Sequence, residues 1–155
     1  MVEITDLLTP KSVLPHLKAS CKKQALEALA RAASDLIGLP FEDILDKLLE
    51  RERLGSTGVG GGVAIPHGKV EGAEQLFGIL ARLDQPIEFE AVDDRPVDIL
   101  FLLIAPEGAG AEHLKALARV SRLLRDRSLV DSLRGAESGE ALYAIASEGE
   151  ASHAA

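Results

Sequence analysis

The 155-residue sequence contains no tryptophan and only five other aromatic residues, one tyrosine and four phenylalanines. Hydrophobic residues make up 46% of the chain. Because so few of them are aromatic, the core must be built mainly from leucine, isoleucine, valine and alanine. A chain of this length suits one domain and buries roughly 70% of the surface that its unfolded form exposes. We therefore expect a single domain over residues 1–155, with a frayed tail at residues 148–155, where the sequence is small and polar.

Cysteine is nearly absent as well. Cys21 stands alone, which excludes an internal disulfide and a cysteine metal cluster. His16 and His153 are isolated, and no histidines and carboxylates show metal-ligand spacing, so we predict no metal. No Gly-x-Ser-x-Gly motif is present, which leaves no motif for catalysis by a serine triad.

Long apolar runs and basic stripes are also lacking. The longest apolar run, at residues 99–105, is far below the roughly 20 residues of a membrane span. Residues 1–9 lack the basic start and apolar run of a secretory signal. The formal net charge is −8, without a dense stripe of lysine and arginine, which disfavours nucleic acid as a partner. We expect a cytoplasmic protein with no membrane insertion.

Apolar residues with a period near 3.6 predict two helices in the first third of the chain. The first covers residues 22–37, with Ser20 as its N-cap and a stop signal at Gly38. The second covers residues 41–53 and ends at Gly55.

Further helices are predicted near the carboxyl end, at residues 109–125, 128–134 and 138–147. The buried stripe of the first of these three is expected to comprise Leu114, Leu117, Ala118, Val120, Ser121 and Leu124.

Three strands are predicted between the two groups of helices, at residues 63–65, 76–83 and 97–104. The last is apolar at seven of its eight positions, which indicates a central strand covered on both faces. Residues 55–62 hold five glycines and are predicted to form a loop. Strands interleaved with helices indicate an α/β sandwich on a mixed sheet.

His67 is the first candidate for chemistry. Pro66 before it fixes φ, and Gly68 after it permits positive φ, so the backbone around the imidazole is constrained. A histidine ring is mostly neutral near pH 7 and can act as a nucleophile towards phosphorus. A turn histidine without a role is the alternative interpretation.

His113 and two arginines are further candidates. His113 lies at the start of a predicted helix, where backbone N–H groups favour a negative charge, although a solvent-facing histidine fits equally. Arg51 and Arg53 precede the glycine loop and carry guanidinium groups that suit phosphate oxygens. Helix-end arginines are common without such a role, and position alone does not choose between these two.

The glycine loop also offers candidates, namely Ser56, Thr57 and Gly58, whose hydroxyl and backbone groups can bind a phosphoryl group. It is not a Walker loop, since no Gly-Lys-Ser/Thr follows at the needed spacing. It is not a dinucleotide loop, since no strand precedes it and no helix begins after it.

Two segments carry a family resemblance. Residues 51–60 (Arg-Glu-Arg-Leu-Gly-Ser-Thr-Gly-Val-Gly) and residues 62–69 (Gly-Val-Ala-Ile-Pro-His-Gly-Lys) resemble the active-site signature of enzyme IIA domains of the bacterial phosphotransferase system, mannitol/fructose type. The nitrogen-regulatory branch is the most similar, as residues 6–8, 18–26 and 86–98 also indicate.

The resemblance implies a fold and a set of site residues. The fold is a mixed sheet of roughly five strands sandwiched between helices. His67 is implied as the phosphoryl acceptor, His113 as a supporting group and Arg51, rather than Arg53, as the phosphate contact. Gly61 departs from the pattern, because a polar residue is common there.

The resemblance also implies a function. It predicts a phosphotransferase that forms a phosphohistidine, uses no cofactor and takes its phosphoryl group from a histidine-containing phosphocarrier protein. Its phosphorylation state would regulate partners such as transporters or sensor kinases. A sugar-specific enzyme IIA that passes phosphate to a permease component is the alternative, and a binding module that has lost transfer is a second one.

Overall fold

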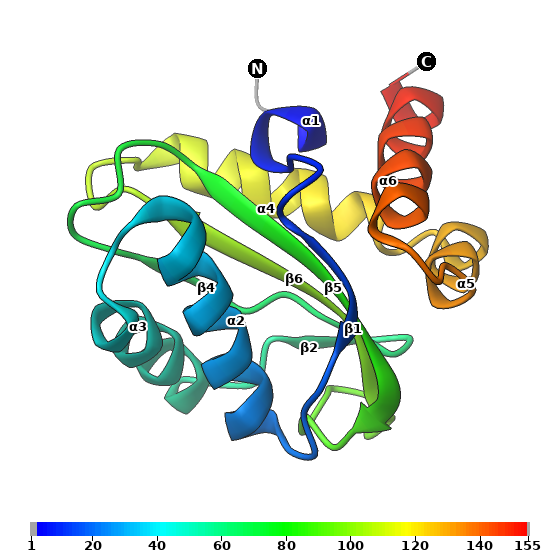
Figure 1. Cartoon of the computed structure of the whole chain (residues 1–155), viewed down its shortest axis with the longest axis horizontal. Helices are drawn as coiled ribbons and strands as arrows, with labels where there is room; N and C mark the ends of the chain where they lie inside the picture. The colour runs from blue at the N-terminus through cyan, green and yellow to red at the C-terminus, as the bar shows by residue number, and fades with distance from the viewer. Residues whose placement is uncertain (1–2, 155) are drawn as a thin grey trace.

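The computed structural model describes residues 3–154, and side chains over residues 3–152. One mixed sheet of six strands lies between two layers of helices (Figure 1). The strands are β1 (Val13–Leu17), β2 (Gly58–Gly60), β3 (Val63–Ala64), β4 (His67–Lys69), β5 (Phe77–Ile87) and β6 (Val97–Ala105). The helices are α1 (Ile4–Leu7), α2 (Lys22–Ile37), α3 (Phe41–Arg53), α4 (Ala111–Leu123), α5 (Arg127–Arg134) and α6 (Gly139–Ala154). The predicted α/β sandwich is confirmed, with one strand more than expected.

Strand β6 is central, as its apolar sequence predicted. The sheet order is β1-β5-β6-β3-β2, and β4 also pairs with β6. Both β3 and β4 run parallel to β6, with Val63 opposite Ile99 and His67 opposite Leu103. Residues 63–69 therefore follow β6 as one strand that is interrupted at residues 65 and 66, and His67 is the first residue after the interruption.

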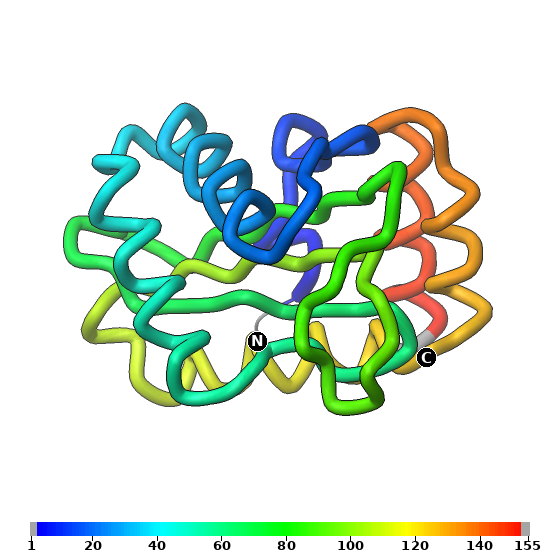
Figure 2. The backbone as a smooth tube through the Cα atoms, turned by 90° about the horizontal axis from the view of Figure 1, so that it is seen from below, coloured from blue at the N-terminus to red at the C-terminus, as the bar shows by residue number. Residues whose placement is uncertain are grey.

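Alternate residues of the sheet serve two separate cores. Phe101 and Leu103 of β6 pack with residues of α1, α4, α5 and α6. Leu100 and Leu102 pack with residues of α2 and α3. Successive side chains of a strand point to opposite faces, so a strand buried on both faces must be apolar throughout. Figure 1 shows α2 and α3 on one side of the strands and α4 on the other, and Figure 2 views the molecule from the side of α2 and α3.

Helices α2 and α3 have the predicted bounds. Gly38 is the C-cap of α2 with a φ of 74°, which confirms its stop signal. The N-cap, however, is Cys21 and not Ser20. Ser20 is one residue too early, and its backbone N–H and hydroxyl both donate to the Gln24 side chain instead, at 2.8 and 2.7 Å.

The glycine loop contains a strand that the sequence did not predict. Strand β2 pairs with β3 in a hairpin in which Gly60 lies opposite Val63. The two residues between them, Gly61 and Gly62, have φ values of 67° and 82°. A two-residue hairpin turn with positive φ at both positions strongly favours glycine. This turn explains why position 61 departs from the polar residue expected there.

The buried face of α4 differs from the predicted stripe. Its buried residues are His113, Ala116, Val120 and Leu123, whereas Leu114 is 67% exposed. Of the predicted positions, Val120 in the helix and Leu124 directly after its end are buried. The helix is therefore rotated so that His113 points into the molecule.

The expected frayed tail is helical over residues 148–154, and residue 155 lies outside the described part. Helix α6 continues to Ala154 because Glu150 contacts the first helix. Its carboxylate accepts the backbone N–H groups of Ile4 and Thr5 and lies 3.6 Å from the Arg119 guanidinium. Among residues 3–154, no helix is long and apolar enough to cross a membrane.

Candidate functional site

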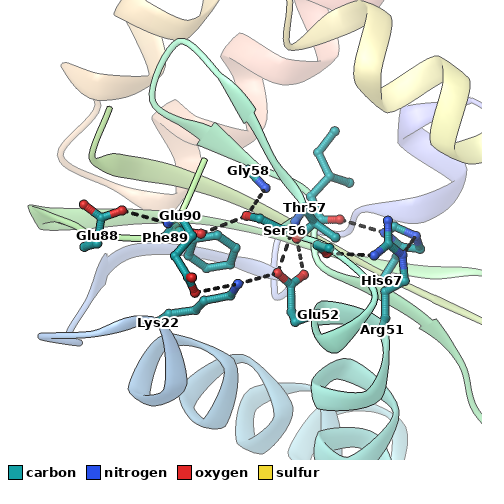
Figure 3. Close-up of polar contacts among 12 residues, drawn as sticks. Lys22, Arg51, Glu52, Ser56, Thr57, Gly58, His67, Glu88, Phe89 and Glu90 are labelled. Carbon is teal, nitrogen blue, oxygen red and sulfur yellow. Dashed lines mark hydrogen bonds and ion pairs between the residues drawn. The ribbon is translucent and has the colours of Figure 1, made fainter. Parts of the chain in front are cut away.

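One ring nitrogen of His67 contacts a hydrogen-bond acceptor, and the other contacts a hydrogen-bond donor (Figure 3). Nδ1 lies 2.8 Å from the Ile65 carbonyl oxygen, and Nε2 receives a hydrogen bond from Arg51 Nε at 3.2 Å. A carbonyl oxygen only accepts and a guanidinium only donates. Both contacts are satisfied by a neutral imidazole with its proton on Nδ1. The lone pair of Nε2 therefore faces Arg51.

The residues on either side of His67 fix its position in the sheet. The Pro66 carbonyl accepts the Leu103 N–H of β6 at 2.9 Å. The expected positive φ of Gly68 is not found, because this residue is part of β4. Its lack of a side chain serves packing instead, since a Cβ there would lie 3.3 Å from Lys47 Cβ of α3. Helix α3 thus approaches β4 closely, one turn before Arg51.

Arg51 and Arg53 have different surroundings. Besides its contact with His67, the Arg51 guanidinium donates from Nη1 to the Gly55 carbonyl at 2.9 Å. Arg53 is exposed, and within residues 3–152 its side chain has no hydrogen bond or ion pair. The structure therefore brings Arg51 into contact with His67 and leaves Arg53 away from that ring.

His113 lies beside His67. The two ring centroids are 5.7 Å apart, and the rings are tilted by 48°. His113 is only 7% exposed, and its Nδ1 is buried with no hydrogen-bond partner in the described part of the chain. It belongs to the first turn of α4, whose N-terminus has no side-chain cap. The solvent-facing alternative for His113 is wrong.

Burial lowers the pKa of both histidines. For His67, burial lowers the pKa most; the Ile65 carbonyl and the Glu52 charge raise it, and the Arg51 charge lowers it. For His113, burial is again the largest cause, followed by the positive charges of His67 and Lys69. Both rings are thus kept neutral in the resting site.

The loop residues predicted to bind phosphate make contacts within the protein. Ser56 Oγ donates to the Phe89 carbonyl at 2.8 Å and accepts the Gly58 N–H at 3.0 Å. Thr57 Oγ1 donates to Glu52. A Cβ at Gly58 would lie 2.7 Å from Ala91 Cβ, so only glycine fits. In this structure the hydroxyl groups shape the loop, and neither donates towards His67.

Glu52 is a site-building residue that the sequence reasoning missed. Its side chain is 6% exposed, pairs with Lys22 Nζ at 2.9 Å, and accepts the Thr57 backbone N–H at 3.1 Å (Figure 3). The available signal was its spacing, since Glu52 follows the buried Ile44 and Leu48 of α3 at intervals of four. A carboxylate on a buried helix face requires donors, and here they come from α2 and the glycine loop.

The chain resembles known proteins over nearly its whole length. The family model described as phosphoenolpyruvate-dependent sugar phosphotransferase system, EIIA 2, matches residues 6–149. A nitrogen regulatory protein of Bradyrhizobium diazoefficiens is 54% identical over 142 residues, which cover 92% of this chain and 93% of the relative. A fructose-specific EIIA component of Haloferax volcanii is 33% identical over 151 residues, which cover 95% of this chain and 98% of the relative.

A solved structure agrees with these sequence relationships. The crystal structure of the nitrogen regulatory protein IIA-Ntr from Neisseria meningitidis superposes with a TM-score of 0.86 at 34% identity, covering 92% of this chain and 97% of that one. The family resemblance predicted from the sequence is confirmed. The chain belongs to the EIIA 2 family of the phosphoenolpyruvate-dependent sugar phosphotransferase system, in its nitrogen-regulatory branch.

Proposed function

We propose that this protein is a phosphocarrier of a nitrogen-related phosphotransferase system and that His67 Nε2 accepts the phosphoryl group. The donor is a histidine-containing phosphocarrier protein, and transfer takes place in the cytoplasm. One observation carries the proposal. The Ile65 carbonyl fixes the proton on Nδ1, which leaves Nε2 unprotonated, with its lone pair turned to the Arg51 guanidinium that donates to it.

The reaction is an in-line transfer between two imidazoles. The bond from phosphorus to the donor nitrogen breaks as the bond to His67 Nε2 forms, and the donor ring keeps the electron pair. The protein's task is to position the groups and neutralise charge. Arg51 offers guanidinium N–H groups to the phosphoryl oxygens, and His113 lies close enough to support them. No cofactor takes part.

The output of the proposed reaction is regulatory. Partner proteins, such as transporters or sensor kinases, would bind one phosphorylation state of the protein. The alternative is a sugar-specific enzyme IIA that transfers the phosphoryl group to a permease component. The nitrogen regulatory names of the Bradyrhizobium and Neisseria relatives support the first output. A sugar-phosphorylation assay with candidate permease components separates the two.

Intact mass spectrometry tests the acceptor. Incubation with the complete donor chain should add one phosphoryl group to the wild type and none to His67→Ala. The bond should be labile to acid and stable to alkali, as for phosphohistidine. Uptake of one phosphoryl group by His67→Ala would show that the acceptor is another residue. Proteins captured by His67→Ala and His67→Asp then identify regulated partners.

A further inference from the structure

A hollow in the surface lies away from the histidines. It has a volume of about 470 Å³, and neither His67, His113 nor Arg51 lines it. Its walls come from the tip of the β2–β3 hairpin, the connection between β5 and β6, and the α4–α5 junction. The hairpin tip points toward α5 in Figure 1, and Arg134 of α5 donates to the Gly61 carbonyl. Sites for small molecules have volumes of roughly 300–1,000 Å³.

Three arginines of this pocket form no ion pair or hydrogen bond with their side chains within residues 3–152, although backbone hydrogen bonds and, after them, the charge of Arg95 lower the pKa of the Asp93 carboxyl. These arginines are Arg95, Arg125 and Arg127, and all three are exposed. They come from two segments of the chain, Arg95 from the connection between β5 and β6, and Arg125 and Arg127 from the α4–α5 junction. The chain has 25 acidic against 17 basic residues, so carboxylate partners are plentiful overall. Three unpaired arginines at one pocket are therefore a local excess of positive charge.

The acidic residues of the same pocket are already engaged. Asp93 accepts the backbone N–H groups of Gly61 and Arg95, at 3.0 and 3.1 Å. Asp131 binds Arg134 Nη1 at 3.0 Å, and Nε of the same guanidinium is bound at 2.8 Å by Asp98, which does not line the pocket. These contacts hold the carboxylates against the pocket wall. The free guanidinium groups are the ones that remain for a ligand.

The pocket also offers apolar surface. Val92 is 76% exposed and Val59 is 45% exposed, and both line the pocket. Leu124 and Val130 form part of its wall. Guanidinium groups bind phosphates in a bidentate manner, and apolar side chains cover the organic body of a ligand. The combination suits a molecule with phosphate groups at one end and a ring at the other.

We infer that this arginine pocket binds a phosphorylated small molecule of nucleotide size. Its phosphate groups contact Arg95, Arg125 and Arg127, and its organic part contacts Val59 and Val92. The inference does not depend on phosphoryl transfer at His67, because no residue of the histidine site lines the pocket.

Isothermal titration with adenosine diphosphate as the probe tests the inference. We expect saturable binding with one site per chain, and at least about tenfold weaker binding of adenosine and of inorganic phosphate, since each lacks one half of the contacts. Arg125→Gln/Arg127→Gln should lower the affinity about tenfold or more. Arg125→Lys/Arg127→Lys should also weaken binding, because lysine cannot form the bidentate contact.

Two controls make the result specific. Lys18→Gln/Lys23→Gln removes the same charge from exposed positions outside the pocket and should leave the affinity unchanged. Arg95→Gln, on a separate segment, should weaken binding as well. The His67→Ala variant should bind the probe as the wild type does, whether or not His67 accepts phosphate. The inference would be overturned if the probe does not bind saturably, or if Arg125→Gln/Arg127→Gln binds it as tightly as Lys18→Gln/Lys23→Gln does. Loss of binding in His67→Ala would overturn it as well.

Discussion

The two nitrogens of the His67 ring have different tasks in the proposed mechanism. Nδ1 is held by the Ile65 carbonyl, which fixes the ring and its tautomer. Nε2 faces Arg51 and is the proposed nucleophile. A histidine is neutral above its pKa, so a pKa lowered by burial extends the neutral range to more acidic pH. The ring can therefore stay neutral and accept a phosphoryl group at a lower pH than a free histidine can.

The arginine beside His67 is the most direct target at the residue scale. We expect Arg51→Lys to slow phosphoryl transfer about tenfold or more, because charge-assisted hydrogen bonds contribute roughly 1.5–3 kcal/mol and each 1.4 kcal/mol is a factor of ten. Rapid-quench measurement of transfer from the donor protein gives the rate. Arg53→Lys is the matched control, since Arg53 is exposed and has no contact with His67. Equal effects of the two changes would contradict the role given to Arg51.

His113 should support His67 without accepting the phosphoryl group. Its pKa is lowered by burial, by repulsion from His67 when that ring is protonated, and by the charge of Lys69. A nearly dianionic phosphoryl group on His67 favours a protonated neighbour. We therefore expect the pKa of His113 to rise on phosphorylation, so that the ring becomes charged at higher pH than before. NMR titration of both imidazoles measures this.

A His113→Ala variant complements the titration. It should reduce the transfer rate or the retention of the phosphoryl group and leave the stoichiometry at one. If the pKa of His113 does not move on phosphorylation, the phosphoryl group does not lie beside this ring. The arrangement proposed for the site would then have to be abandoned.

At the scale of elements, the long helices could be predicted, whereas of the three shortest strands only β3 was expected, as the strand at residues 63–65. Helices α2 and α3 have several turns of apolar periodicity, and Gly38 and Gly55 mark where they end. Strands β2, β3 and β4 have two or three residues each. Periodicity cannot identify so short a strand. Strands β3 and β4 form because β6 offers them a partner, and β2 forms because it pairs with β3, so all three depend on tertiary structure.

Helix α4 shows a different limit of sequence reasoning. Its sequence contains two overlapping apolar stripes, one through Leu114 and one through Ala116 and Val120. Counting large apolar residues favours the first stripe, which places His113 on the outside. Packing against β6 selects the second, in which small residues lie against the sheet and a histidine is buried. Thus a place for His113 in the site was implied by the family resemblance and not by periodicity, and its burial came only with the structure.

The carboxylate of Glu150, near the end of α6, should contribute to the stability of the protein. Glu150→Ala removes the acceptor for the buried N–H of Ile4 and the partner of Arg119. We expect a loss of about 1–3 kcal/mol in the free energy of unfolding, because an unsatisfied buried group costs its full desolvation. Urea denaturation measures it. Glu148→Ala, two residues earlier and exposed, should stay within about 0.5 kcal/mol of the wild type. Similar losses in both variants would show that the end of α6 is held by other contacts.

At the scale of the molecule, the candidate site is assembled from both helical layers. Arg51 comes from α3 on one face of the sheet, and His113 comes from α4 on the other. His67 lies between them on β4, which pairs with β6. The sequence places these residues 16 and 46 positions apart, and only the closed sandwich brings them together. This is why spacing alone could not choose between Arg51 and Arg53, whereas the close packing of Lys47 against Gly68 settles which of them reaches His67.

Glu52 links the helix that carries Arg51 to α2 and to the glycine loop. Its carboxylate joins α2 through Lys22 and the glycine loop through Thr57, on the helix that carries Arg51. Glu52→Gln removes the charge of the ion pair and weakens the anchoring of the loop. We expect slower phosphoryl transfer and a loss of roughly 1–3 kcal/mol in stability, since hydrogen bonds to buried charged groups contribute in this range.

The titration of His67 separates this effect from a general loss of structure. The negative charge of Glu52 raises the pKa of His67, so the Gln variant should have a lower His67 pKa than the wild type. A partly unfolded site would instead return that pKa towards its ordinary value of 6.5. NMR titration and transfer rates at pH 8, where His67 is neutral in both proteins, distinguish the two. Glu50→Gln, more exposed on the same helix, is the matched control and should change neither quantity. A His67 pKa that rises in Glu52→Gln would mean that Glu52 acts on the site only by holding the fold together.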